Sequence, residues 1–137
     1  MKKSYIFIIV GIMLSFGVIA SIWESILSFN APSSVQQCDS LNMTVLAWAS
    51  GYNESTAIYI KPASGSNWTS LCLFPKTFIN GNKTFNCAPI ISQDPGNYTL
   101  RASINKEACG SWTPTPNVTS CGDYKDRSLR VNSSNLC

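Results

Sequence analysis

An uncharged, largely apolar stretch near the N-terminus divides this 137-residue chain into two parts. The stretch runs from Ser4 to Trp23 and follows the positively charged pair Lys2 and Lys3. All six cysteines and all seven Asn-x-Ser/Thr sequons lie C-terminal to it. Such a run directs the following chain across a membrane, to the side where disulfides persist and Asn is glycosylated. The sequence therefore predicts a cytoplasmic N-terminus and an extracellular C-terminal domain.

The run is long enough to stay in the membrane as a permanent anchor. A span of about 30 Å of hydrocarbon needs roughly 20 residues, and Trp23 stands where an interfacial aromatic residue belongs. An apolar pattern at helical spacing continues past Glu24, in Ile22, Trp23, Ile26, Leu27 and Phe29. We therefore expect a transmembrane helix over residues 1–29. The alternative is a signal peptide that is cleaved near Ala20, which would leave a secreted protein.

Small residues recur within the run at a spacing that lets two membrane helices approach closely. They are Gly11 with Ser15, and Gly17 with Ser21. This pattern fits packing against a partner helix, but it also fits a solitary anchor, because small residues are frequent in membrane helices. Pro32 cannot donate a helical hydrogen bond, so we expect a linker over residues 30–34 and a domain over residues 35–137.

The composition of the part beyond the run restricts both domain number and partners. From Ala31 onward there are 107 residues, enough for one domain with a modest core. Eight Lys/Arg face six Asp/Glu there, without a basic cluster. A nucleic-acid surface would need clustered basic residues, so this class of partner is excluded.

Short runs rich in Val, Ile, Tyr, Phe and Thr alternate with Gly, Pro, Asn and Ser clusters, which is typical of β structure. The expected strands are Val35–Asp39, Asn42–Ser50, Thr56–Lys61, Trp68–Phe74, Lys83–Ile90, Asn97–Ile104 and Arg127–Asn132. The segment between Cys109 and Cys121 contains two prolines and is expected to be a loop. Trp48 ends an apolar strand and is expected in the core.

The stretch Asn97–Ile104 alternates apolar and polar residues, as on a sheet with one buried face and one wet face. Together with the turn before it, Asp94-Pro95-Gly96-Asn97-Tyr98-Thr99-Leu100 resembles the entry to strand F of immunoglobulin-like sandwiches. The resemblance implies that the Tyr98 hydroxyl bonds to upstream backbone. Leu100 stands where immunoglobulin domains carry a cysteine, so the wider class that includes fibronectin type III domains matches better. The resemblance also implies that Thr44–Ala49 is strand B, Ala57–Lys61 is strand C and Lys83–Cys87 is strand E of such a sandwich.

The expected fold class is thus all-β, an immunoglobulin-like antiparallel β-sandwich of about seven strands preceded by one N-terminal transmembrane helix. Six cysteines beyond a membrane indicate a disulfide framework. Neighbouring positions favour Cys72 with Cys87 and Cys109 with Cys121, which leaves Cys38 with Cys137; Cys38 with Cys109 is a competing pair.

Glycosylation is the modification that the sequence indicates most directly. The sequon asparagines are Asn42, Asn53, Asn67, Asn82, Asn97, Asn117 and Asn132. Chance would give two or three sequons at this composition, so the excess favours selection for N-linked glycans over incidental matches. Because glycans need solvent, these asparagines are expected on outward faces and loops.

No catalytic motif is present, and we expect neither an enzyme nor a cofactor or metal site. The chain has no histidine, and its acids beyond residue 30 are scattered. These acids are Asp39, Glu54, Asp94, Glu107, Asp123 and Asp126. Asp123 and Asp126 with Lys125 and Arg127 are interpreted as a solvated charged turn. Trp68 and Trp112 lie among small and polar residues and are candidate interface residues, because Trp is enriched at binding hot spots.

Three functions remain open. The first is a membrane-anchored, glycosylated domain with a structural, adhesion or recognition role at the cell surface, and a protein partner bound through the helix or the domain. The second is an accessory subunit of a larger membrane complex. The third is a filament or coat subunit, which predicts that Val35–Asp39 or Arg127–Asn132 is supplied to its sheet by a neighbouring copy.

Overall fold

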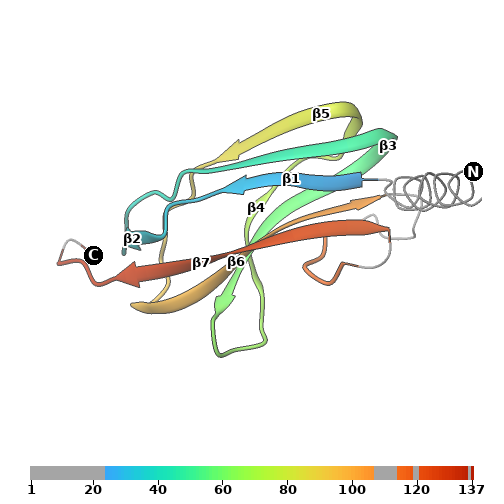
Figure 1. Cartoon of the computed structure of the whole chain (residues 1–137). Helices are drawn as coiled ribbons and strands as arrows, with labels where there is room; N and C mark the ends of the chain where they lie inside the picture. The colour runs from blue at the N-terminus through green and yellow to red at the C-terminus, as the bar shows by residue number, and fades with distance from the viewer. Residues whose placement is uncertain (1–23, 107–113, 119–120, 136) are drawn as a thin grey trace, which may run out of the picture.

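The computed structural model of the chain describes residues 24–106, 114–118, 121–135 and 137. Seven strands account for most of this part (Figure 1). They are β1 (Glu24–Asn30), β2 (Ser34–Gln36), β3 (Met43–Pro62), β4 (Thr69–Leu73), β5 (Thr77–Cys87), β6 (Gly96–Lys106) and β7 (Gly122–Asn132).

The long strand β3 belongs to both layers of the structure (Figure 1). Its first half pairs with β1 over Thr44–Ala49 and with β5 over Met43–Glu54, whereas its second half, from Glu54, pairs with β6 and β4. The register shifts between Ser50 and Tyr52, where Gly51 has a φ of 89°, a conformation that glycine adopts without strain. β7 pairs with β6 antiparallel and with β2 in parallel. One layer is thus β1, β3 and β5, and the other is β4, β3, β6, β7 and β2.

The core lies between these layers, on the faces that the sequence alternation predicts. β6 contributes Leu100, Ala102 and Ile104, each fully buried, while the first half of β3 contributes Val45, Ala47 and Ala49. Burial of a side chain such as leucine or isoleucine contributes roughly 1.5–3 kcal/mol. The remaining large core residues include Ile26, Phe29, Leu41, Met43, Ile58, Ile60, Ile79, Phe85, Ile91, Leu129 and Val131.

Residues 24–30 form a strand, so the helix expected over residues 1–29 is wrong for its last part. β1 pairs with β3 and has a bulge between Ile26 and Ser28. The bulge breaks the alternation of two, so that Ile26 and Phe29 both face the core at a spacing that looks helical in sequence. The linker expected over residues 30–34 is also wrong, because Ser34 already belongs to β2. The sandwich therefore includes the described residues from Glu24 onward and does not start near Val35.

The anchor itself and its small-residue pattern fall on residues 1–23, outside the described part of the chain. Within the described part, no helix has the length and apolar character that crossing a membrane requires.

The seam between β1 and β7 closes one side of the sandwich through side chains instead of a strand ladder. The backbone N–H of Ile26 donates to Asp123 Oδ2 at 2.8 Å, and Arg127 Nε donates to the Phe29 carbonyl at 2.9 Å. These groups lie on the edge of β1 that β3 leaves unpaired. The solvated turn expected around Asp123 and Arg127 is therefore wrong, since both residues belong to β7 and satisfy the backbone of β1.

Strand exchange as a filament mechanism is contradicted by the pairing of the strands that it would have supplied in trans. β2 pairs with β7 of the same chain over Ser34–Gln36, and β7 pairs with β6 over Gly122–Val131. Both segments therefore complete their own sheet.

Two of the three expected disulfides are confirmed. Cys38 is bonded to Cys137, which rules out its pairing with Cys109, and Cys72 on β4 is bonded to Cys87 on β5. Cys121 is also disulfide-bonded; Cys109 lies outside the described residues.

The expected number of seven strands is confirmed for the described residues, although the strands themselves differ from those expected. The expected strands Asn42–Ser50 and Thr56–Lys61 are one continuous strand, β3, and β1 was not expected. Trp48 is half-buried and outside the core cluster, contrary to expectation. It lies on the outward row of β3, because Val45, Ala47 and Ala49 take the inward positions.

Candidate recognition surface

Arg101 on β6 is the centre of a charged and aromatic cluster on the outer face of the β3–β6–β7 layer. Its Nε and Nη2 donate to the two carboxylate oxygens of Asp126 on β7 at 2.8 and 2.9 Å. The guanidinium carbon lies 4.7 Å from the ring centroid of Trp68 and 3.9 Å from that of Tyr124. Hydrogen bonding to Asp126 raises the pKa of Arg101 above its ordinary value. A permanent cation is therefore held between two aromatic rings.

Lys61 on β3 adds a second cation to Trp68. Its Nζ lies 5.2 Å from the ring centroid of Trp68 and donates to the Gly65 carbonyl at 3.0 Å. Lys61, Trp68, Arg101, Tyr124 and Asp126 are hereafter called the cation–aromatic cluster. Tyr124 is 46% exposed and Trp68 is half-buried, so part of the aromatic surface faces solvent.

The loop after β6 covers the outer face next to this cluster. Thr115 accepts hydrogen bonds through its carbonyl from Ser103 Oγ at 3.1 Å and Asn105 Nδ2 at 3.3 Å. Arg101 Nη1 donates to the Pro116 carbonyl at 3.1 Å. The outer face of β3 is covered too, since Tyr59 is only 5% exposed, and burial raises its pKa to about 12. The cluster is thus braced by the loop and two strands, which limits the rotamers that its side chains can adopt.

Sequence reasoning found one member of this cluster and missed the others. Trp68, a predicted interface residue, lies in it, whereas Trp112 falls outside the described residues. Arg101 could have been flagged, because it occupies an outward position of the clearly alternating strand. Asp126 and Tyr124 could not, since their approach depends on the register of β6 with β7, which pairs Arg101 with Asp126.

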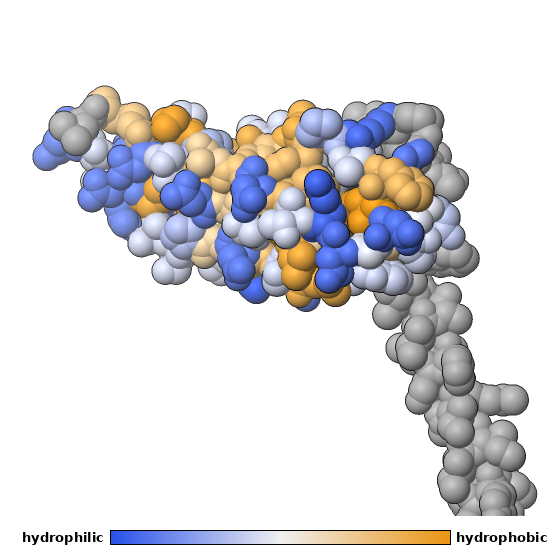
Figure 2. All heavy atoms as spheres, turned by 90° about the horizontal axis from the view of Figure 1, so that it is seen from above, coloured by the Kyte–Doolittle hydropathy of each residue, from blue (hydrophilic) through white to orange (hydrophobic). Residues whose placement is uncertain are grey.

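All seven sequon asparagines are exposed in the structure, as glycosylation requires. The side chain of Asn97 on β6 points outward and accepts a hydrogen bond from Arg130 Nη1 at 3.1 Å. Asn67 directly precedes Trp68 in sequence, and Asn117 lies in the covering loop. Figure 2 shows the molecule from above the view of Figure 1, where β5 lies at the top. Apolar and hydrophilic residues intermingle across this surface.

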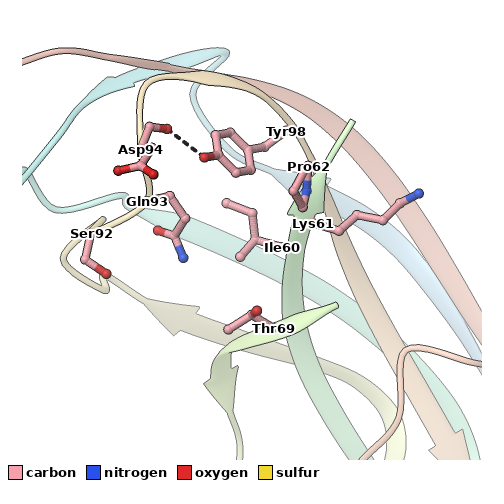
Figure 3. A pocket seen from close by; sticks show the side chains of 8 residues that line it. All are labelled: Ile60, Lys61, Pro62, Thr69, Ser92, Gln93, Asp94 and Tyr98. Atoms are coloured by element: carbon pink, nitrogen blue, oxygen red, sulfur yellow. Dashed lines mark hydrogen bonds between the residues drawn. The ribbon is translucent and has the colours of Figure 1, made fainter. Parts of the chain in front are cut away.

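A shallow cavity of about 300 Å³ lies near the start of β6, at the end of the sandwich where β3 ends (Figure 3). Its wall includes Gln93, whose Oε1 is buried without a hydrogen-bond partner. Tyr98 forms another part of the wall, and its hydroxyl donates to the Asp94 carbonyl at 2.6 Å, which confirms the expected tyrosine corner. The lining is completed by Ile60, Lys61, Pro62, Thr69 and Ser92.

At the opposite end of the sandwich two carboxyl groups are buried between the layers. Glu24 is 5% exposed and Glu54 is 1% exposed, and neither oxygen of Glu54 has a hydrogen-bond partner. Burial, more than any nearby charge, raises the pKa of Glu24 to about 7 and that of Glu54 to about 8. Burial of Glu24 was not predictable from the sequence, because this residue stands next to the apolar run. Within the described residues, no three His, Cys, Asp or Glu side chains are grouped so that they could hold a metal ion.

Comparison with known proteins shows the fold and no family. No protein-family model matches the chain, and no curated protein matches it. Among solved structures it is similar to the C-terminal domain of wzt, with a TM-score of 0.58 and 15% identity over 81% of this chain and 74% of that one. It is also similar to a Niemann-Pick type C2 protein from Japanese carpenter ant, with a TM-score of 0.55 and 4% identity over 80% and 93% of the two chains.

A third similar structure is β-glucosidase from Listeria innocua, with a TM-score of 0.51 and 14% identity over 78% of this chain but only 16% of that one. At such identities the likeness concerns the fold alone. With the pairing of the strands, it establishes that the described residues form an all-β, immunoglobulin-like sandwich of seven strands that is stabilised by disulfides.

Proposed function

We propose that this protein is a non-enzymatic, N-glycosylated extracellular domain, held at the cell surface by residues 1–23 as a single transmembrane anchor, with its N-terminus in the cytoplasm. Its role is to recognise a protein partner through the cation–aromatic cluster. The disulfides support the extracellular placement, because such bonds persist in oxidising compartments. The exposure of every sequon supports glycosylation.

The observation that carries the recognition role is the composition and rigidity of the cluster. Trp, Tyr and Arg are the residues most enriched at binding hot spots, and here the Arg101 guanidinium contacts the rings of both Trp68 and Tyr124. The bidentate contact with Asp126 fixes Arg101 before any partner arrives, so little side-chain entropy remains to be lost on binding.

Co-purification with matched surface variants tests this role. We expect gentle detergent extraction of the native membrane to yield the full chain with a defined partner. The double variant Trp68→Ala and Tyr124→Ala should lose that partner, since removal of a hot-spot residue weakens binding by roughly 30-fold or more. Ile90→Ala is the control, because Ile90 is 63% exposed and outside the cluster.

The outcomes separate the candidate functions. A partner retained by the double variant but lost when Gly11 and Gly17 are replaced by leucine would assign recognition to the helix and favour an accessory subunit. A glycosylated monomer without any partner would contradict both. Intact mass measurement of the native protein, reduced and unreduced, reports in addition whether residues 1–23 are retained and how many sequons carry glycans.

A further inference from the structure

Sequon asparagines stand opposite aromatic residues on two neighbouring strands. β3 and β5 pair antiparallel along one layer of the sandwich (Figure 1). In their register Asn82 on β5 pairs with Trp48 on β3, and Asn53 on β3 pairs with Phe78 on β5. Both sequon asparagines of this ladder therefore face an aromatic residue on the other strand, and the two pairs run in opposite directions across the ladder.

The side chains of both pairs project to the outer face of the layer. Ile79 and Phe85 are buried and take inward positions of β5, so Phe78 and Asn82, which alternate with them, point outward. Residues directly opposite in an antiparallel ladder share one face, and their Cβ atoms lie about 4.5–5.5 Å apart. Each of the two asparagines therefore stands beside an aromatic ring on the same surface.

Small polar side chains surround Trp48 on this face. Ser25 pairs with Trp48 from the β1 side and Asn82 from the β5 side. The register makes Asn80 and Thr84 its diagonal neighbours on β5. These two residues and Asn82 are exposed, whereas Trp48 is half-buried. Part of the indole surface is therefore open above short neighbours, on the side where Asn82 lies.

The ring of Phe78 lies along the sheet surface. Phe78 is 62% exposed, and a Cβ built on Gly51 would lie 3.8 Å from its Cζ atom. Cζ is the far end of the ring, so the ring leans over the backbone of β3 instead of pointing away from it. Asn53, the partner of Phe78 in the ladder, is exposed. A group attached to Asn53 would meet the exposed surface of this ring.

We propose that Trp48 and Phe78 are the platforms on which the first sugars of the glycans on Asn82 and Asn53 pack. This inference rests on the proposed N-glycosylation. A pyranose sugar has an apolar face of C–H groups, which are attracted to the negative face of an aromatic ring. Because the sugar is tethered to the asparagine opposite the ring, the contact is intramolecular, and even a weak attraction keeps it populated.

The contact stabilises the folded state, because ring and sugar meet only while β3 and β5 are paired. It also gives the two layers different surfaces. The packed sugars would cover part of the outer face of the β1–β3–β5 layer, whereas the cation–aromatic cluster lies on the outer face of the other layer. The proposed recognition surface would therefore not be covered by these two sugars.

The direct test is an NMR measurement on the full chain in mild detergent. The protein is produced in cells that N-glycosylate, and an endoglycosidase trims each glycan to one N-acetylglucosamine. We expect nuclear Overhauser effects between the sugar on Asn82 and the indole protons of Trp48, and between the sugar on Asn53 and the ring protons of Phe78. The sugar protons should shift upfield, because they lie over the face of a ring.

A double-mutant cycle measures the contact by its effect on stability. In the trimmed protein, Asn82→Gln should lower the midpoint of thermal unfolding by roughly 4 °C, the shift expected for a contact as strong as an aromatic pair. In the Trp48→Val background the same change should have no effect, because the ring is already absent. Asn132→Gln is the control: Asn132 pairs with Gln36, so loss of its sugar should have the same effect in both backgrounds.

A second cycle uses an exposed ring, whose removal leaves the core intact. Asn53→Gln should lower the unfolding midpoint in the native background and leave it unchanged in the Phe78→Ser background. Equal losses with and without the ring refute the contact at that pair, even where the Overhauser effects are too weak to observe.

Glycopeptide mass spectrometry of the native protein separates the ways of failing. Absence of glycans from all seven sequons refutes the proposed glycosylation, and this inference with it. A glycan missing from Asn82 or Asn53 while other sequons are modified overturns the contact at that asparagine alone. Glycans present at both positions, with unfolding midpoints that do not depend on the rings, refute the packing and leave the proposed function standing.

Discussion

Replacement of Glu54 by glutamine tests the electrostatics of the interior most directly. The Glu54 carboxyl is 1% exposed and has no hydrogen-bond partner on either oxygen. Burial first, and then repulsion from Glu24, raise its pKa from 4.5 to about 8, against a smaller lowering by Lys106. Because the folded state binds this proton more tightly than the unfolded state, the protonated carboxyl stabilises the fold below about pH 4.5. That stability is lost as the pH rises towards 8.

The size of the effect follows from the interval between the two pKa values. The rise from 4.5 to about 8 spans about 3.5 pH units, and each unit corresponds to about 1.36 kcal/mol, so the loss reaches a ceiling of about 5 kcal/mol above pH 8. At pH 7 it amounts to about 3 kcal/mol. Glu24, with a pKa raised to about 7, acts with the same sign. Since the two carboxyls repel each other, their contributions do not simply add.

Urea unfolding of the full chain in mild detergent, with disulfides intact and followed by Trp fluorescence from pH 4 to pH 9, measures this effect. We expect the free energy of unfolding of the native chain to fall across this range. Glu54→Gln should unfold like the native chain at pH 4 and be about 3 kcal/mol more stable at pH 7. Asp94→Asn, at an exposed carboxyl, is the control and should leave the pH dependence unchanged. A native stability that rises from pH 5 to pH 8 would refute the reasoning.

Three further changes test separate parts of the structure by the same unfolding assay. Tyr59→Phe should stabilise the domain by about 1 kcal/mol, because the buried Tyr59 hydroxyl has no hydrogen-bond partner. Tyr98→Phe should destabilise it by about the same amount, because the hydrogen bond to the Asp94 carbonyl is lost. Changes in the free energy of unfolding with the same sign for both variants would contradict this account. Replacing Cys38 and Cys137 by serine should lower the free energy of unfolding by about 5 kcal/mol, and replacing Cys72 and Cys87 should lower it by about 3 kcal/mol. The first loss is larger because the bridged positions are 99 residues apart, against 15 for the second pair. A larger loss for the second pair would show that strain outweighs chain entropy. Gly122→Ala should lower the free energy of unfolding by about 1–3 kcal/mol and expose the loop at residues 114–118 to proteolysis. The reason is that a Cβ at position 122 would lie 2.5 Å from the Ile104 carbonyl oxygen and 2.6 Å from Val118. An unchanged unfolding midpoint and an unchanged cleavage pattern would show that the loop does not pack as described.

The parts of the fold that were predictable are those in which a local pattern decides the structure. Strand β6 follows from its strict alternation, and the tyrosine corner follows from the turn before Tyr98. The disulfide between Cys72 and Cys87 follows from cysteines in neighbouring segments, and the one between Cys38 and Cys137 follows as the pair left over. In each case the information lies within a few residues or in a single long-range covalent bond.

The parts that could not be predicted depend on register or on a local irregularity. A bulge hid β1, because it gives Ile26 and Phe29 the spacing of a helix. The cation–aromatic cluster needs the pairing of Arg101 with Asp126 and the return of β4 beside β3. The burial of Glu54 needs both layers in place, and nothing near it in sequence distinguishes it from an exposed acid.

The disulfide between Cys38 and Cys137 has a mechanical consequence. A pulling force applied between the N-terminal segment and Cys137 would pass through β1 and the segment with β2 as far as Cys38, and would then cross the covalent bridge. The chain between the two cysteines, which holds β3 to β7 and most of the core, would lie outside the path of the load. β1 would bear it in shear along its ladder with β3, so the domain could transmit tension while the outer face that carries the cation–aromatic cluster kept its shape.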